Sequence, residues 1–210
     1  MFLVSLSACS NSDSEPQTTI EADKSTDTVS TSAPVVPVVP DTPTVPETVE
    51  DQSSDLVEIM LVDKLDESRG YCLDIAGGQG ARAPIERGLQ AHTCYNYRGE
   101  ILEDQGFDST LINTGQFKIS YFDVCMTVAS ITAGTSLSLE ACNGSENQTF
   151  ALNDSGQLVV KSAPELCVTL DSSQQKTGRG GTPPHVMHPV SIEACDDAKQ
   201  AYQTWSLNSL

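Results

Sequence analysis

The sequence predicts an all-β domain made of three copies of one unit, and three observations support this prediction. Six of the seven cysteines form three successive pairs after residue 71. A Gln-x-aromatic tripeptide follows each pair, and the surrounding apolar segments are short and bounded by turn residues. A period of roughly 40–50 residues indicates one supersecondary unit used three times, because a single unit cannot bury its apolar face alone.

The three units share one layout. They contain Cys72, Cys94 and Gln105-Gly106-Phe107; Cys125, Cys142 and Gln148-Thr149-Phe150; and Cys167, Cys195 and Gln203-Thr204-Trp205. The hexapeptide that ends at Cys142 (LSLEAC) closely matches the one that ends at Cys195 (VSIEAC). Six cysteines allow fifteen pairings by count, but only pairing within each unit respects the repeat. We therefore expect the disulfides Cys72–Cys94, Cys125–Cys142 and Cys167–Cys195, and no metal bound by these cysteines.

Short apolar segments predict the strands in order along the chain. Strands are expected at Gln116–Tyr121, Leu137–Leu139, Gln157–Lys161 and Leu166–Leu170, with turns at 113–115 and 153–156. Both turns contain Asn and Gly, which tolerate positive φ. Short strands at regular spacing favour a barrel or a sandwich, and no amphipathic helix of ten or more residues is visible after residue 56. The three tripeptide aromatics, Phe107, Phe150 and Trp205, are expected to fill the core.

These motifs carry a family resemblance. Cys72-Leu73-Asp74, the Leu89-Gln90-x-x-x-Cys94 segment and the three Gln-x-aromatic tripeptides resemble the ricin B-type lectins, which are β-trefoils. The resemblance covers residues 57–210. It implies a β-trefoil in which the three aromatics share one core and in which each repeat has at most one shallow sugar pocket.

The resemblance implies one carbohydrate site, in the first repeat. Its residues would be Asp74, Gln90, His92, Asp104 and Gln105. In the family, the Asp accepts sugar hydroxyls and an aromatic residue two positions before the second cysteine stacks on the sugar ring. His92 stands at the stacking position and Asp104 stands where Asn is usual. The alternative is a decayed site in which Asp74 only caps a turn.

Three tyrosines flank the disulfide of the first repeat. Tyr71, Tyr95 and Tyr97 could supply the aromatic face that His92 replaces, since tyrosine joins a flat apolar body to a polar tip.

The second and third repeats have lost the family pattern. Thr127 and Thr169 replace the Asp, Glu140 and Glu193 replace the aromatic residue, and Tyr202 replaces the last polar residue of the third repeat. A threonine hydroxyl cannot accept two sugar hydroxyls as a carboxylate can. We therefore expect both repeats to be structural.

The third repeat contains an insertion at 171–189 with a glycine-rich stretch and the pair His185 and His188. Zinc needs a third or fourth ligand, and no phosphate-loop context surrounds the glycines. The insertion is expected to be a surface loop that could contact a protein partner.

Residues 1–9 resemble a bacterial lipoprotein signal peptide. Leu6-Ser7-Ala8-Cys9 follows an apolar run and matches a lipobox cleaved before Cys9. The run is short and no Lys or Arg precedes it, which an upstream start codon would explain; the alternative is an unprocessed terminus with a free thiol. Ser10 after the cysteine indicates the outer membrane, with a lipid anchor on Cys9.

Residues 10–56 are expected to form a disordered tether, because Ser, Thr, Pro and acidic residues dominate and cannot bury enough apolar surface. The tether separates the signal from a domain at 57–210. The formal net charge of −18 excludes nucleic acid as a partner, since phosphate binding needs clusters of Lys and Arg.

The cysteine pairs indicate an exported protein, because disulfides persist in oxidising compartments. The sequence thus predicts a carbohydrate-binding module of a lipid-anchored envelope protein. The alternative is a β-trefoil used as a protein-interaction subunit of an envelope or toxin assembly, without sugar binding. No catalytic motif is visible, so neither an enzyme nor a cofactor is expected.

The lipid anchor can be tested in cells. The Cys9→Ser variant should move the protein from the membrane fraction to the soluble fraction, because the acylated residue is lost. Intact-mass measurement of the wild-type protein should show loss of Met1–Ala8 and a gain of acyl chains. A soluble wild-type protein that retains Met1 would contradict the prediction.

Overall fold

The computed structural model describes residues 55–95 and 101–209. These residues belong to one compact unit, Thr48–Leu210. Cys9, the predicted signal, the predicted tether as far as residue 54, and Tyr97 lie outside the described residues, and the tether's last predicted residue, Leu56, begins β1 (Leu56–Leu61). Within the described residues, no helix is long and apolar enough to cross a membrane.

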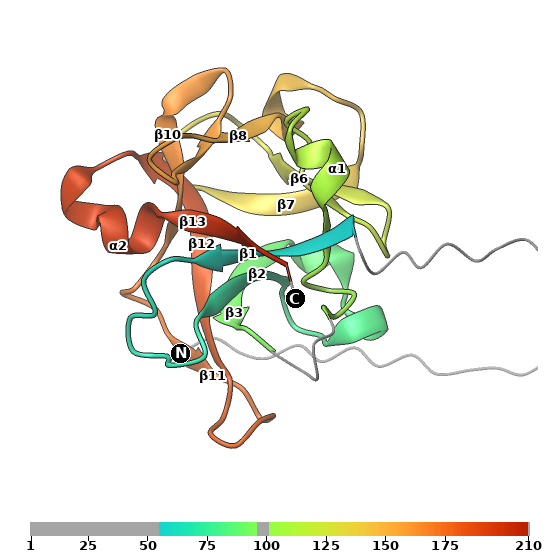
Figure 1. The fold of residues 1–210 in the computed structure, drawn as a ribbon, viewed down its shortest axis with the longest axis vertical. Coiled ribbons are helices and arrows are strands. Elements are labelled where there is room, and N and C mark those ends of the chain that lie inside the picture. The colour runs from blue at the N-terminus through green and yellow to red at the C-terminus, as the bar shows by residue number, and fades with distance from the viewer. Residues whose placement is uncertain (1–54, 96–100, 210) are drawn as a thin grey trace, which may run out of the picture. The chain divides into compact units, whose positions relative to one another are not determined.

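The strands of residues 55–95 and 101–209 number thirteen and form one hydrogen-bonded sheet, whose arrangement is drawn in Figure 1. They are β1 (Leu56–Leu61), β2 (Tyr71–Ile75), β3 (Leu89–Thr93), β4 (Phe107–Asp108), β5 (Lys118–Ile119), β6 (Val124–Val128), β7 (Thr135–Ala141), β8 (Phe150–Leu152), β9 (Leu158–Val160), β10 (Ala163–Leu170), β11 (Lys176–Thr177), β12 (Val186–Ala194) and β13 (Trp205–Asn208). The short helices are α1 (Ser109–Ile112) and α2 (Gln200–Gln203), with 3₁₀ turns η2 (Gly80–Arg82), η3 (Ile85–Arg87), η4 (Glu146–Gln148) and η5 (Asp197–Lys199). The protein is therefore all-β, as the sequence predicts.

The strand order is β3-β2-β1-β4-β5-β6-β7-β12-β10-β9-β8, and an additional pairing joins β3 to β12. The path from β3 to β12 thus closes on itself, which leaves no free edge between these strands. The first and last strands also pair, with Leu61 opposite Trp205, and Figure 1 shows β1 and β13 side by side. Both ends of the described domain are held in the sheet.

Strand β12 joins the third unit to the first. Its later residues pair with β10, for example Ile192 with Val168, whereas Met187 and His188 pair with His92 and Ala91 of β3. Strand β11 pairs with the start of β12 to form a hairpin. The prediction that residues 171–189 form a surface loop is therefore partly wrong. Residues 186–189 belong to β12, and the backbone of this part of β12 pairs with β3.

The remaining predicted strands are present with shifted ends. Strand β5 is shorter than the expected Gln116–Tyr121, and β9 is shorter than Gln157–Lys161, whereas β7 and β10 begin earlier than expected. Both turn clusters contain a glycine at positive φ, with φ +96° at Gly115 and +77° at Gly156. These values lie in the region that favours glycine.

The three tripeptide aromatics lie in the core, as expected. Phe107 and Phe150 are fully buried and Trp205 is 1% exposed. The indole Nε1 of Trp205 donates a hydrogen bond to the Val168 carbonyl at 2.9 Å, so the polar atom of the largest core side chain is satisfied.

The three expected disulfides are present. Cys72–Cys94, Cys125–Cys142 and Cys167–Cys195 have Cα–Cα distances of 5.0, 5.0 and 5.1 Å. In each bond, the first cysteine lies on a strand, and the second directly follows the last residue of the neighbouring antiparallel strand. In the chain-entropy model, loops of this size contribute about 3 kcal/mol each to stability.

Truncating the buried indole tests the core. Trp205→Ala should lower the free energy of unfolding by about 3–5 kcal/mol, because it leaves a cavity among packed side chains. Urea denaturation monitored by circular dichroism measures the change. Leu207→Ala on the same strand is the control, since Leu207 is 41% exposed and should cost much less. Equal losses for the two variants would contradict this description of the core.

Candidate functional site

Two strands and the segment before β4 position the five candidate carbohydrate residues. Asp74 on β2 lies directly opposite Gln90 on β3, and Cys72 lies opposite His92. Because alternate residues of a strand point to the same face, the register places Asp74 and Gln90 as a cross-strand pair. Asp104 and Gln105 precede β4.

Asp74 is held by two amides. The Nε2 atoms of Gln90 and Gln105 each donate a 3.0 Å hydrogen bond, one to each carboxylate oxygen of Asp74. Asp74 and Gln105 have no exposed surface, whereas Gln90 is only partly buried. The structure therefore brings these three candidate residues together, with Gln90 on the outer side.

A second carboxyl group lies beside this cluster. Asp104 is fully buried, and its Oδ2 accepts a 3.4 Å hydrogen bond from the Tyr95 hydroxyl. Its Oδ1 accepts no hydrogen bond of good geometry from a described residue. The nearby Gly80 N–H lowers the pKa of Asp104, but burial raises it by more. Burial raises the pKa of Asp104 to about 6, and burial together with the charge of Asp104 raises the pKa of Asp74 well above its usual range. Ionising both carboxyls is therefore unfavourable.

His92 does not present an open ring face in this structure. The side chain is 6% exposed, and its ring centroid lies 4.8 Å from that of Tyr95 and 5.0 Å from that of His185. The Nδ1 atom donates to the Thr93 carbonyl at 2.7 Å. Burial lowers the pKa of His92 to about 4, so the ring is neutral at pH 7.

The flanking tyrosines also point inward. Tyr71 is fully buried, and its hydroxyl donates to Asp66 Oδ1 at 2.8 Å and lies 3.3 Å from His188 Nε2. Tyr95 is 6% exposed and packs against His92. Neither of these tyrosines forms the exposed aromatic face that the sequence suggested.

The insertion is tied to the first unit by a polar network. Arg69 forms a 2.6 Å salt bridge with Glu67 and donates to the carbonyls of Pro183 and Pro184 at 3.0 and 2.9 Å. The hydroxyl of Thr93 contacts Glu67 and accepts from the Val186 N–H at 2.8 Å. Hydrogen bonds from Arg69 lower the pKa of Glu67 to about 2. Sequence reasoning missed this network, because no motif marks the pairing of Arg69 with carbonyl groups more than a hundred residues away.

The glutamine of each tripeptide makes the same contact in its own unit. Gln148 Nε2 donates to Thr127 Oγ1 at 3.1 Å, and Gln203 Nε2 donates to Thr169 Oγ1 at 2.9 Å. Gln105 makes the equivalent contact with a carboxylate rather than a hydroxyl. Only the first of the three units has a carboxyl group at this position.

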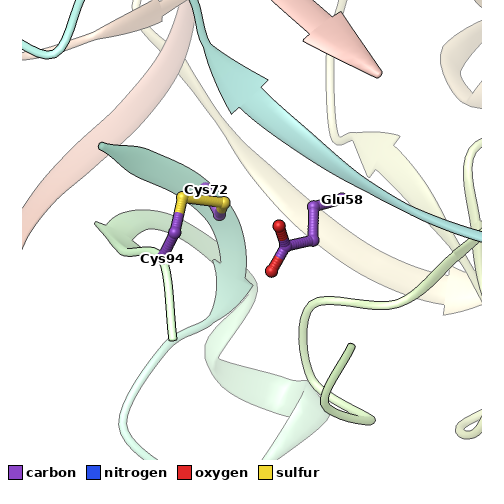
Figure 2. A group of neighbouring side chains, drawn as sticks. All are labelled: Glu58, Cys72 and Cys94. Atoms are coloured by element: carbon purple, nitrogen blue, oxygen red, sulfur yellow. A yellow bond between two sulfur atoms is a disulfide. The ribbon is translucent and has the colours of Figure 1, made fainter. Parts of the chain in front are cut away.

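Three residues with metal-binding side chains meet at the start of the domain. Figure 2 shows the carboxylate of Glu58 directed toward the bonded sulfur atoms of Cys72 and Cys94. The sulfurs are joined in a disulfide, so they are not the thiolates that bind metals. His185 and His188 belong to no group of three such residues among the described parts of the chain.

Glu58 itself is an unusual buried acid. It is 1% exposed, and Asn208 Nδ2 donates to its Oε2 at 3.0 Å. Burial raises the pKa of Glu58 above its ordinary value. The folded protein therefore holds this proton to higher pH than the unfolded chain does, and the protein loses stability as pH rises through the folded pKa.

Replacing this acid tests the pH dependence. Glu58→Gln keeps an oxygen for Asn208 and removes the ionisation, so its melting temperature should rise relative to wild type between pH 4 and pH 8. Thermal unfolding at a series of pH values measures the difference. The exposed Glu86→Gln is the control and should show little change. A difference for Glu58→Gln that is constant or falls with pH would be inconsistent with a buried, raised-pKa carboxyl.

Comparison with solved structures identifies a similar fold. The solution structure of the mdaA-1 domain is 16% identical, with a TM-score of 0.51 over 72% of this chain and 88% of that chain. A non-toxic homologue of type II RIPs from Momordica charantia (bitter gourd), in complex with α-methyl-D-galactoside, is 12% identical, with a TM-score of 0.47 over 72% of this chain and 47% of that chain. The C-half of the earthworm R-type lectin, in complex with GalNAc, is 11% identical, with a TM-score of 0.49 over 74% of this chain and 99% of that chain.

A search of curated protein sequences finds no match. The profile of the ricin-type beta-trefoil lectin domain matches residues 64–184, which is more than half of the 210-residue chain. The matched segment includes the Asp74 cluster and two complete disulfide pairs. The chain therefore belongs to the ricin-type beta-trefoil lectin family.

Proposed function

We propose that this protein binds carbohydrate through the first unit, at Asp74, Gln90, His92, Asp104 and Gln105. The observation that carries the proposal is the Asp74 carboxylate held between two amides, within the segment that matches the lectin family. A lectin domain is a binding module and not a catalytic one. The function proposed is accordingly recognition of a glycan, without a reaction.

The hydrogen-bonding capacity of the cluster supports a polar ligand. A carboxylate offers about four acceptor positions, and the two amides occupy one on each oxygen of Asp74. Asp74 has no exposed surface, so its remaining positions would accept sugar hydroxyls after Gln90 moves aside, while Gln105 keeps the carboxyl group oriented. A ligand would approach from the side of Gln90, which is the partly exposed member of the cluster.

The two other units lack this acceptor and serve the fold. Their buried glutamines contact threonine hydroxyls, which have less capacity to accept hydrogen bonds than a carboxylate has. The repeated contact supports a β-trefoil of three equivalent repeats at 57–210, each with its own disulfide, in which only the first repeat retains a sugar site of the family type.

The cellular setting completes the proposal. A signal at 1–9, a lipid on Cys9 and a tether at 10–56 would display the domain on the bacterial outer membrane. Many anchored copies on one surface could engage a polymeric glycan together, which raises the apparent affinity without new contacts.

One observation favours the alternative of a protein-interaction module. His92 is covered by Tyr95 and by His185 from the insertion, so the usual stacking position is closed in this structure. In that alternative, the surface of the insertion at 171–189 would contact a protein partner.

Titration with sugars, monitored by NMR on the full-length chain, tests the proposed site. Glucose, galactose and N-acetylgalactosamine are suitable probes, and the best of them should shift resonances around Gln90 with a Kd of roughly 1 mM, because a few hydrogen bonds must offset the entropy of association. Asp74→Ala should weaken this binding at least tenfold. Thr127→Ala and Thr169→Ala are matched controls that should leave it unchanged.

A second variant guards against a folding defect. Asp74 is fully buried, and its removal takes away the acceptor of the Gln90 and Gln105 amides. Asp74→Ala should therefore also lower the free energy of unfolding by about 1–3 kcal/mol. Gln90 lies on the outer side of the cluster and is partly exposed. Gln90→Ala should therefore weaken sugar binding with little loss of stability. If no sugar shifts any resonance near Gln90, or if Gln90→Ala binds as well as wild type, the site is not in the first unit.

A further inference from the structure

Part of the insertion covers two aromatic rings of the first unit. His185 packs edge-on against His92, with ring centroids 5.0 Å apart, and against Tyr95, with centroids 5.3 Å apart. His92 and Tyr95 are each 6% exposed. His185 belongs to the hairpin that β11 forms with the start of β12, here called the insertion hairpin (residues 176–186). The insertion hairpin therefore covers both rings.

Tyr95 connects the covered rings to the carboxyl cluster of the first unit. Its hydroxyl donates a 3.4 Å hydrogen bond to Asp104 Oδ2. On β3, His92 lies two residues after Gln90, and residues at this spacing point to the same face of a strand. Gln90 in turn donates to Asp74. The rings under the insertion hairpin thus adjoin the residues of the proposed sugar site.

Hydrogen bonds from two residues of the first unit hold the insertion hairpin in place. The Arg69 guanidinium donates to the carbonyls of Pro183 and Pro184 at 3.0 and 2.9 Å, and both bonds are exposed to solvent. Thr93 Oγ1 accepts from the Val186 N–H at 2.8 Å. These polar contacts join the hairpin to the first unit in addition to the ring contacts of His185.

The insertion hairpin itself buries little surface. Residues 172–184 are exposed apart from the half-buried Gly178, and His185 is the first buried residue after them. Two backbone hydrogen bonds close the tip, from Gly178 N–H to the His185 carbonyl at 2.7 Å and from His185 N–H to the Gly180 carbonyl at 2.9 Å. A segment with few buried contacts and exposed hydrogen bonds opens at a smaller free-energy cost than the core. The hairpin can therefore lift while the rest of the sheet stays intact.

The charges around the two imidazoles make this closure sensitive to pH. Burial lowers the pKa of His92 to about 4 and also lowers the pKa of His185; the Arg69 charge adds to both effects, and the Glu67 charge opposes them. Tyr95, which packs on both rings, is uncharged in this pH range. An exposed histidine has a pKa of about 6.5. Closure is therefore most favourable above about pH 6.5 and weakens as the pH falls toward 4, because the open state binds more protons.

We infer that the insertion hairpin is an acid-released lid over the first-unit site. It covers His92 and Tyr95 at neutral pH and lifts when the facing imidazoles of His92 and His185 are protonated. The lid regulates the sugar site of the proposed function, and it therefore rests on that function. While the lid is closed, the apparent sugar affinity is reduced to the fraction of molecules that are open.

Hydrogen exchange of the full-length chain, without a ligand, tests the motion of the lid. The protection factors of the His185 and Val186 amides should fall about tenfold between pH 7 and pH 5, because the open state takes up protons in this range. The Met126 amide donates to the Phe117 carbonyl at 2.8 Å in the core and is the internal control. Its protection should stay nearly constant. His185→Phe should reduce the fall, because it keeps a covering ring and removes one of the two facing charges.

Sugar titration at pH 7, monitored by NMR, tests the effect of the lid on binding. Glucose, galactose and N-acetylgalactosamine are the probes. His185→Ala removes the covering ring and Arg69→Gln removes the guanidinium that holds the hairpin, so each should lower the Kd of the best probe about tenfold. Arg179→Gln is the matched control, since Arg179 is exposed in the same hairpin and should leave the Kd unchanged. The pH is held constant because the raised pKa of Asp104, about 6, would otherwise alter the sugar site itself.

The outcomes separate the lid from the sugar site. If wild type, His185→Ala and Arg69→Gln bind a sugar with the same Kd, the sugar site stands and the lid is overturned. The lid is also overturned if the hairpin amides lose no more protection than Met126 between pH 7 and pH 5. If none of the proteins binds any of the three sugars, the proposed function fails, and the gating of that site fails with it even where exchange shows the hairpin opening. The two variants remove different contacts, so either one decides the question if circular dichroism shows that the other is unfolded.

Discussion

A buried glutamine side chain is the interaction on which each unit depends. Gln105, Gln148 and Gln203 are at most 1% exposed, and each uses Nε2 to bind the residue two positions after the first cysteine of its unit. Their Oε1 atoms accept from backbone N–H groups just after the second cysteine, at distances of 3.4, 2.8 and 2.9 Å. Both the amide N–H groups and the carbonyl oxygen of a buried glutamine need hydrogen-bond partners. These contacts therefore fix the two disulfide-linked segments relative to the core aromatic residue that follows the glutamine.

The same constraint explains where the units can differ. The residue that receives the glutamine Nε2 can be a threonine or an aspartate without loss of the contact. Asp74 therefore preserves this hydrogen bond and adds a carboxyl group. The cost is that burial raises the pKa of Asp104, and that burial together with the charge of Asp104 raises the pKa of Asp74. Stability and recognition are thus linked at one position in the first unit.

Much of the fold followed from pattern alone. The spacing of Cys125, Cys142 and their equivalents gave the disulfides, and the tripeptides gave the core aromatics, because both depend on local repetition. The role of β12 was not visible in the sequence. His185 and His188 are buried, since β12 pairs with β3 across nearly a hundred residues, and short-range patterns carry no information about such pairing.

The central claim is that this family member binds glycans, and a glycan microarray probed with the oxidised full-length chain tests it most directly. Retention is expected on arrays of neutral or amine-bearing glycans, with little retention on polyuronates, because the chain carries a formal net charge of −18. A correctly disulfide-bonded protein that binds no glycan on such an array would contradict the claim.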